Sequence, residues 1–69
     1  METFTNHNGL CVVLERVKDT ALIALTYNEI TPYVVPMIHK KGESDWCSGK
    51  YLHTLDDALK YFNSAVGYS

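Results

Sequence analysis

The sequence has little of what nucleic-acid binding or membrane insertion would require. It contains a single arginine among six basic residues, against eight acidic ones, and its formal net charge is −2. Affinity for nucleic acid grows with the number of phosphates that Lys and Arg neutralise, so this balance disfavours nucleic-acid binding. The longest nearly apolar run, residues 21–25, is far too short to span a membrane.

Cysteine is also scarce, since Cys11 and Cys47 are the two in the chain. A small secreted domain would usually carry more cysteines, in a disulfide framework. Residues 1–9 are polar and lack the apolar centre of a secretory signal. We therefore expect reduced thiols and a cytoplasmic protein. Ligand pairs such as Cys-x2-Cys or His-x3-His are absent from the sequence, so we expect no metal ion and no other cofactor.

Catalytic signatures are missing as well. The sequence contains neither a Gly-x-Gly-x-x-Gly motif nor a P-loop. Nothing in the sequence places either cysteine beside a helix N-terminus or a cationic neighbour that would activate it. Asp56 and Asp57 would point about 100° apart on a helix, so they do not form one acid–base site. We expect that the protein is not an enzyme, and we assign no catalytic residue.

What the chain does have is apolar residues, which make up 46% of its 69 residues. This length suits one domain, which we expect to cover residues 1–69. Residues 1–9 are either a frayed lead-in or a short first strand. Pro36 has no backbone N–H, so we expect it at a sheet edge or a bulge. Apolar runs of strand length, the last one weaker, predict β-strands over residues 10–17, 21–27, 33–39 and 45–52.

The C-terminal segment has the signals of an amphipathic helix. Thr54 is a suitable N-cap, and Asp57 stands three residues later, as in a capping box. Gly67 stands where a helix commonly ends. The apolar positions between them follow helical spacing. They are Leu55, Ala58, Leu59, Phe62, Ala65 and Val66.

Together these elements predict an α+β fold. We expect a small antiparallel β-sheet of three to four strands, connected as a meander and packed against one C-terminal α-helix. The first two predicted strands, residues 10–17 and 21–27, are apolar on both sides. Strands that are buried on both faces have such continuous apolar runs. Because one helix covers only one face, either the sheet curls around its own core or its second face packs on another molecule.

Aromatic and basic side chains provide the candidate interaction residues. We expect Tyr33, Trp46 and Tyr51 on the sheet face that the helix leaves open, beside a small basic patch at Lys40 and Lys41. Aromatic side chains of this kind fill cores, form protein interfaces or stack single-stranded bases. All three uses remain open from the sequence, with core packing the commonest.

Residues 46–62 read Trp-x-x-Gly-x-Tyr-Leu-x-Thr-Leu-Asp-Asp-Ala-Leu-x-Tyr-Phe. This pattern resembles the final strand and helix of small uncharacterised proteins from Gram-positive bacteria, their phages and their mobile elements. The resemblance covers a quarter of the chain and implies no catalytic or binding residue. It implies a phage-type accessory protein that binds and modulates a host protein.

We therefore expect a non-enzymatic protein-binding or accessory module. Its partner would be a second copy of the chain, giving a homodimer, or a host protein. The mechanism would be burial of an apolar sheet face or strand addition at an open edge. The alternative is a nucleic-acid-associated regulatory protein that uses Lys40, Lys41 and Lys50 beside Trp46 and Tyr51.

Overall fold

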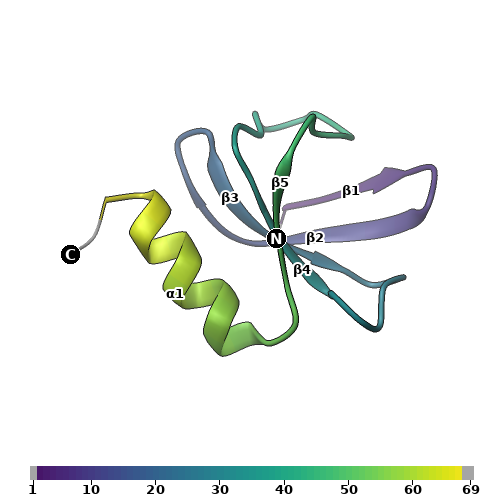
Figure 1. Ribbon diagram of the computed structural model, residues 1–69. Coiled ribbons are helices and arrows are strands. Elements are labelled where there is room, and N and C mark those ends of the chain that lie inside the picture. The colour runs from purple at the N-terminus through teal and green to yellow at the C-terminus, as the bar shows by residue number, and fades with distance from the viewer. Residues whose placement is uncertain (1, 68–69) are drawn as a thin grey trace.

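A computed structural model describes residues 2–67 and contains five strands and one helix (Figure 1). The strands form one antiparallel sheet in the order β1-β2-β3-β4-β5. The predicted α+β meander with one C-terminal helix is confirmed, although the sheet has five strands because residues 2–6 form the first. The elements are β1 (Glu2–Asn6), β2 (Gly9–Val17), β3 (Thr20–Leu25), β4 (Tyr33–Pro36), β5 (Gly49–Leu52) and α1 (Leu55–Ala65).

The sheet curls around a core of its own, which is the first of the two alternatives. An irregularity in β2 between Val13 and Glu15 shifts the register with β3, and such bulges bend a strand. The two sheet faces bury different clusters. The face turned away from the helix buries Cys11, Val13, Ala21, Ile23, Leu25 and Val34, packed against Phe4, Tyr27 and Trp46. The helix side buries Leu22, Val35, Leu52, Ala58 and Phe62.

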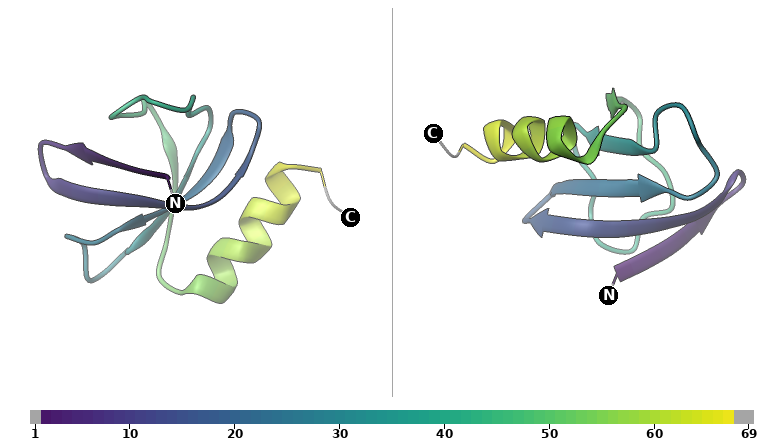
Figure 2. Two further views of the ribbon diagram at one scale, coloured as in Figure 1. Left: turned by 180° about the vertical axis from the view of Figure 1, so that it is seen from behind. Right: turned by 90° about the horizontal axis from the view of Figure 1, so that it is seen from below.

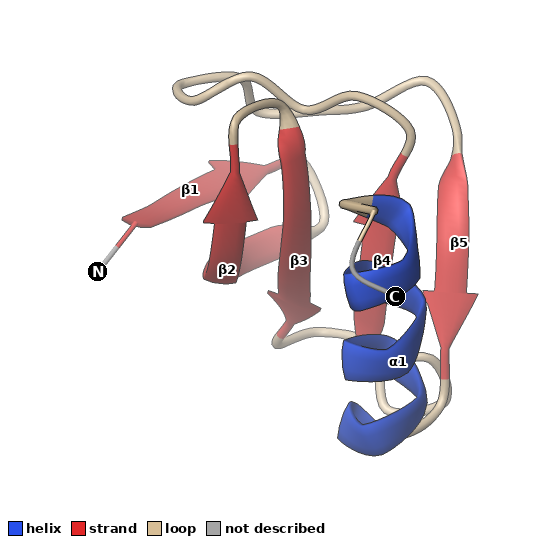
Figure 3. Cartoon of the chain, turned by 90° about the vertical axis from the view of Figure 1, so that its left-hand side faces the viewer, coloured by secondary structure: helices blue, strands red, loops and turns tan. Residues whose placement is uncertain are grey.

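Helix α1 covers only part of its side of the sheet. It packs on β3, β4 and β5, and Figure 3 shows it in front of β4, between β3 and β5. The two views of Figure 2 place α1 and β1 on opposite sides of the molecule. Leu10 and Leu14 of β2 are therefore exposed. The fold itself therefore buries most of the apolar side chains in the continuous runs of β2 and β3.

The helix has the ends that the sequence predicts. The Oγ1 atom of Thr54 accepts a hydrogen bond from the N–H of Asp57 at 3.2 Å. At the other end the helix stops at Ala65, and Gly67 has a φ of 87°, in the left-handed region that favours glycine. No helix within residues 2–67 is long and apolar enough to cross a membrane.

Two predicted strands are shorter than expected at the end of β4 and the start of β5. β4 stops at Pro36 and β5 begins at Gly49, so residues 37–39 and 45–48 are not part of a strand. The expectation for Pro36 was wrong, because β4 lies between β3 and β5 rather than at an edge. Proline is tolerated there because it is the last residue of β4, beyond the positions that pair with β3.

The turn between β2 and β3 contains backbone strain at Lys18, whose φ is 56°. A side chain disfavours this left-handed conformation, whereas glycine adopts it freely. We expect Lys18→Gly to raise the free energy of unfolding by about 0.5 kcal/mol, after the extra entropy of unfolded glycine is subtracted. Urea unfolding measures the change. Lys41→Gly, at a position without positive φ, is the control, and an equal gain in both variants would contradict the strain.

Candidate functional site

The connection between β4 and β5, residues 37–48, is fixed to the curled sheet by a buried histidine. His39 is fully buried, and its backbone N–H donates to the carbonyl of Asp19 at 2.9 Å. Its ring stacks on Phe4, with ring centroids 4.9 Å apart. The ring of Trp46 packs edge-on against both rings, with centroids 6.2 Å from each. The long connection is therefore held by packing as well as by its own hydrogen bonds.

Arg16 joins this histidine to the first strand. Its Nε and Nη2 atoms each donate to the Glu2 carboxylate at 2.8 Å, and Nη1 donates to the carbonyls of Lys18 and His39. The hydrogen bond from Arg16 lowers the pKa of Glu2 below its ordinary value. We call Glu2, Arg16 and His39 the buried anchor, after the fully buried His39; Glu2 and Arg16 are partly buried. It ties β1 and β2 to residues 37–48.

The buried anchor also fixes the tautomer of His39. Nη2 of Arg16 lies 2.9 Å from Nδ1 of His39. Because a guanidinium only donates, Nδ1 accepts, and the ring carries its proton on Nε2. That Nε2–H then donates to the carbonyl of Glu43 at 3.0 Å. Both ring nitrogens are thus satisfied, as burial requires.

Residues of the same connection form a groove of about 710 Å³, which we call the Trp46 groove. Met37 is 77% exposed and Ile38 is 62% exposed, although both are large and apolar. Nε1 of Trp46 donates to the hydroxyl of Tyr51 at 3.1 Å, which sets the orientation of the indole. The groove is lined by Met37, Ile38, Lys40, Glu43, Asp45, Trp46, Cys47 and Ser48.

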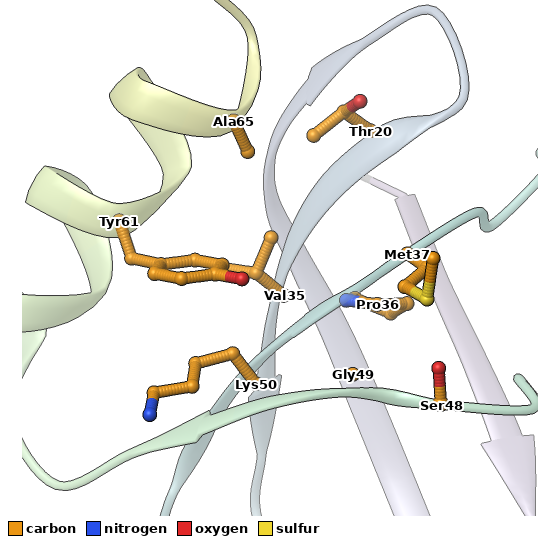
Figure 4. A pocket seen from close by; sticks show the side chains of 9 residues that line it. All are labelled: Thr20, Val35, Pro36, Met37, Ser48, Gly49, Lys50, Tyr61 and Ala65. Atoms are coloured by element: carbon orange, nitrogen blue, oxygen red, sulfur yellow. The ribbon is translucent and has the colours of Figure 1, made fainter.

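A second hollow, of about 420 Å³, lies between α1 and the ends of β4 and β5 that the connection joins (Figure 4). Tyr61 and Ala65 of α1 line one end, as Figure 4 shows, and Met37 and Ser48 line the other. Met37 and Ser48 belong to both concavities. The side chain of Met37 therefore stands between them, and it is accessible from two directions.

The two ends of the connection are held together where β4 ends and β5 begins. The N–H of Met37 donates to the carbonyl of Ser48 at 2.9 Å. Next to this pair, a Cβ atom on Gly49 would lie 2.9 Å from the Cα atom of Pro36 and 3.1 Å from the carbonyl oxygen of Val35. Only glycine fits this position without displacing backbone atoms. Gly49 therefore permits the short distance between the start of β5 and the end of β4.

The structure brings together some of the predicted interaction residues and separates others. Trp46 and Tyr51 are hydrogen-bonded, and Lys40 lines the Trp46 groove beside Trp46. Tyr33 is instead half-buried on the helix side, packed against the cluster of Leu22 and Phe62. Its expected place on the open face was therefore wrong. The side chains alternate along β4, and this alternation turns Tyr33 toward α1.

The predicted basic patch is divided between two concavities. Lys40 lines the Trp46 groove, whereas Lys41 lines a separate hollow formed with Glu2, Thr3, Phe4 and Gly42. The two lysines therefore do not line one shared concavity.

The sequence analysis missed the other six groove residues, which are Met37, Ile38, Glu43, Asp45, Cys47 and Ser48. The apolar run over residues 33–39 predicts one strand, in which side chains alternate between two packed faces. For Met37 and Ile38 the sequence does contain a signal, Pro36, because a residue without a backbone N–H is a natural end for a strand. With the strand ended there, Met37 and Ile38 become loop residues with exposed side chains.

The two thiols differ sharply in accessibility. Cys11 is fully buried, and burial raises the pKa of its thiol, whereas Cys47 is exposed in the Trp46 groove. Because the thiolate is the reactive form, we expect a maleimide to modify Cys47 rapidly and Cys11 only after unfolding. Intact-mass analysis over time measures both rates. Rapid modification of two thiols in the folded protein would contradict the burial of Cys11.

Within residues 2–67, no group of three or more His, Cys, Asp or Glu side chains is placed to hold a metal ion. The chain matches no protein-family model, no curated protein and no solved structure.

Proposed function

We propose that the protein is a non-enzymatic, cytoplasmic protein-binding module and that the Trp46 groove is its binding surface. The observation that carries this proposal is the exposure of Met37 and Ile38 on a connection that the buried anchor fixes in place. Adjacent exposed apolar side chains beside a concave surface are typical of protein interaction sites.

The fixed position of the groove supports the proposal energetically. A loop that becomes ordered only on binding loses conformational entropy in that step, which weakens the affinity. An anchored loop has already lost this entropy on folding. Trp and Met are enriched at protein interfaces, and buried aromatic anchors dominate their binding energy. The hydrogen bond from Trp46 to Tyr51 presents the indole in one orientation. A partner side chain would therefore meet a preformed surface.

The resemblance of residues 46–62 favours one form of this function, an accessory protein of a phage or mobile element that binds and modulates a host protein. A second copy of the chain is the other form of protein partner. We rank a nucleic-acid-associated role below both, because Lys40 and Lys41 line different concavities.

The test compares substitutions of two apolar residues that are equally exposed but lie on different parts of the surface. Met37 is 77% exposed at one end of β4, and Ile30 is 76% exposed beyond its other end. Each is replaced by Asp, and the immobilised proteins are used to capture partners from a cell extract. For a captured protein that is then purified, we expect Met37→Asp to weaken binding at least about tenfold and Ile30→Asp to leave it unchanged.

Two results would contradict the proposal. One is a partner whose affinity is unaffected by Met37→Asp, which would place its binding elsewhere on the molecule. The other is the absence of any partner that distinguishes the two variants. Circular dichroism of both variants checks that each substitution of an exposed side chain leaves the fold intact.

A further inference from the structure

We infer that the Trp46 groove takes a peptide segment in which a Lys or Arg stands next to a large apolar side chain. This inference rests on the proposed function and adds the chemistry of the partner. It follows from the charged residues that line the groove, which an ordinary apolar cleft lacks.

Two acidic residues, Glu43 and Asp45, and one basic residue, Lys40, line the groove. Glu43 accepts the backbone N–H of Lys40 at 2.9 Å, and Asp45 accepts that of Trp46 at 2.8 Å. Within residues 2–67 the only ion pair joins Arg16 to Glu2, so neither groove carboxylate is paired with a cation. The groove therefore has an excess of one negative charge beside its apolar wall.

The hydrogen bonds leave an oxygen of each carboxylate able to accept from a ligand. A Lys or Arg side chain would form charge-assisted hydrogen bonds there, which are stronger than neutral ones. The apolar side chain next to it would lie against Met37, Ile38 and Trp46, which share the same groove. An acidic segment, or the phosphates of a nucleic acid, would instead meet Glu43 and Asp45 with charge of the same sign.

A displayed library of random short peptides tests the inference on the folded, full-length chain. We expect selection to enrich peptides that carry Lys or Arg beside Leu, Ile, Phe or Met. One enriched peptide is then synthesised, and its affinity is measured by titration for the wild type and each variant. Its binding is expected to weaken as the ionic strength rises, because the paired charges are partly exposed.

The variants separate charge from shape. Glu43→Gln combined with Asp45→Asn keeps the size of both side chains and an oxygen for each backbone N–H. We expect this double variant to bind the peptide about fivefold more weakly, the effect of two exposed ion pairs. Lys40→Ala removes the groove cation and is expected to bind about twofold more tightly. Lys41→Ala changes the same charge outside the groove and is the matched control, with no expected effect.

The possible failures are distinguishable. Peptides that lose binding in Met37→Asp but show no cationic preference, and no response to the double variant, would overturn the partner chemistry and leave the proposed function standing. A selection without any peptide that depends on Met37 would overturn both. Tighter binding of a single-stranded oligonucleotide than of any peptide, weakened by Lys40→Ala, would also overturn both.

Discussion

Replacement of Arg16 by Ala is expected to lower the free energy of unfolding by about 3 kcal/mol. The substitution leaves the Glu2 carboxylate without its bidentate partner and Nδ1 of His39 without a donor. Both the Arg16 and the Glu2 side chain are mostly shielded from water, at 16% and 20% exposure. A polar group left unpaired in such surroundings loses its hydrogen bonds without regaining full hydration. Urea unfolding followed by tryptophan fluorescence measures the loss.

Arg16→Lys and Lys60→Ala are the controls for this experiment. Lys keeps the positive charge but cannot form the planar two-pronged contact with Glu2, so we expect an intermediate loss. Lys60 is an exposed residue of α1, and its removal is expected to change the unfolding free energy by less than about 0.5 kcal/mol. Equal effects of Arg16→Ala and Lys60→Ala would show that the buried anchor does not stabilise the fold.

The same contact gives the wild type a dependence on pH. Because Arg16 lowers the pKa of Glu2 in the folded protein, this carboxylate stabilises the fold above its unfolded pKa, about 4.3. That contribution is lost as the pH falls through the lower, folded value. In Arg16→Ala the Glu2 contribution is absent, so the stability difference between the two proteins is expected to shrink in acid. A constant difference across this range would contradict the pairing.

Replacement of Gly49 by Ala is the second large effect that we expect, a loss of about 2 kcal/mol. The added Cβ would lie 2.9 Å from the Cα atom of Pro36, a backbone atom that moves only if β4 and β5 separate. Separation would also strain the neighbouring hydrogen bond from Met37 to Ser48. Thermal unfolding and urea unfolding both measure the loss.

Ser48→Ala is the matched control for Gly49→Ala, because it changes the adjacent residue without adding an atom between the strands. We expect it to alter the unfolding free energy by less than about 0.5 kcal/mol. If Gly49→Ala were as stable as Ser48→Ala, the close approach of β4 and β5 would not be a feature of the folded protein.

Local signals in the sequence were enough to predict the helix and the longest strand. Thr54, the apolar stripe and Gly67 all act within a few residues of one another, so the bounds of α1 follow from them. The continuous apolar run of residues 10–17 likewise predicts β2. The curl of the sheet depends on the irregularity near Val13 and on the connection that packs over the core, which no local pattern encodes.

The candidate site was predictable only in part. Trp46 and Tyr51 lie close in the sequence, and their proximity in space could be expected. The burial of His39 could not, because its partners Phe4 and Arg16 come from β1 and β2 and reach it only after the sheet curls. The exposure of Met37 depends on that same burial, since His39 fixes the connection on which Met37 stands.

The reaction rate of Cys47 tests the central claim most directly, because this thiol lines the Trp46 groove. The measurement is the rate of maleimide modification with and without a saturating partner or selected peptide, with buried Cys11 as the internal reference. If the partner occupies the groove, Cys47 is expected to react at least about tenfold more slowly in the complex. An unchanged rate for Cys47 in a fully formed complex would contradict the assignment of the Trp46 groove as the binding surface.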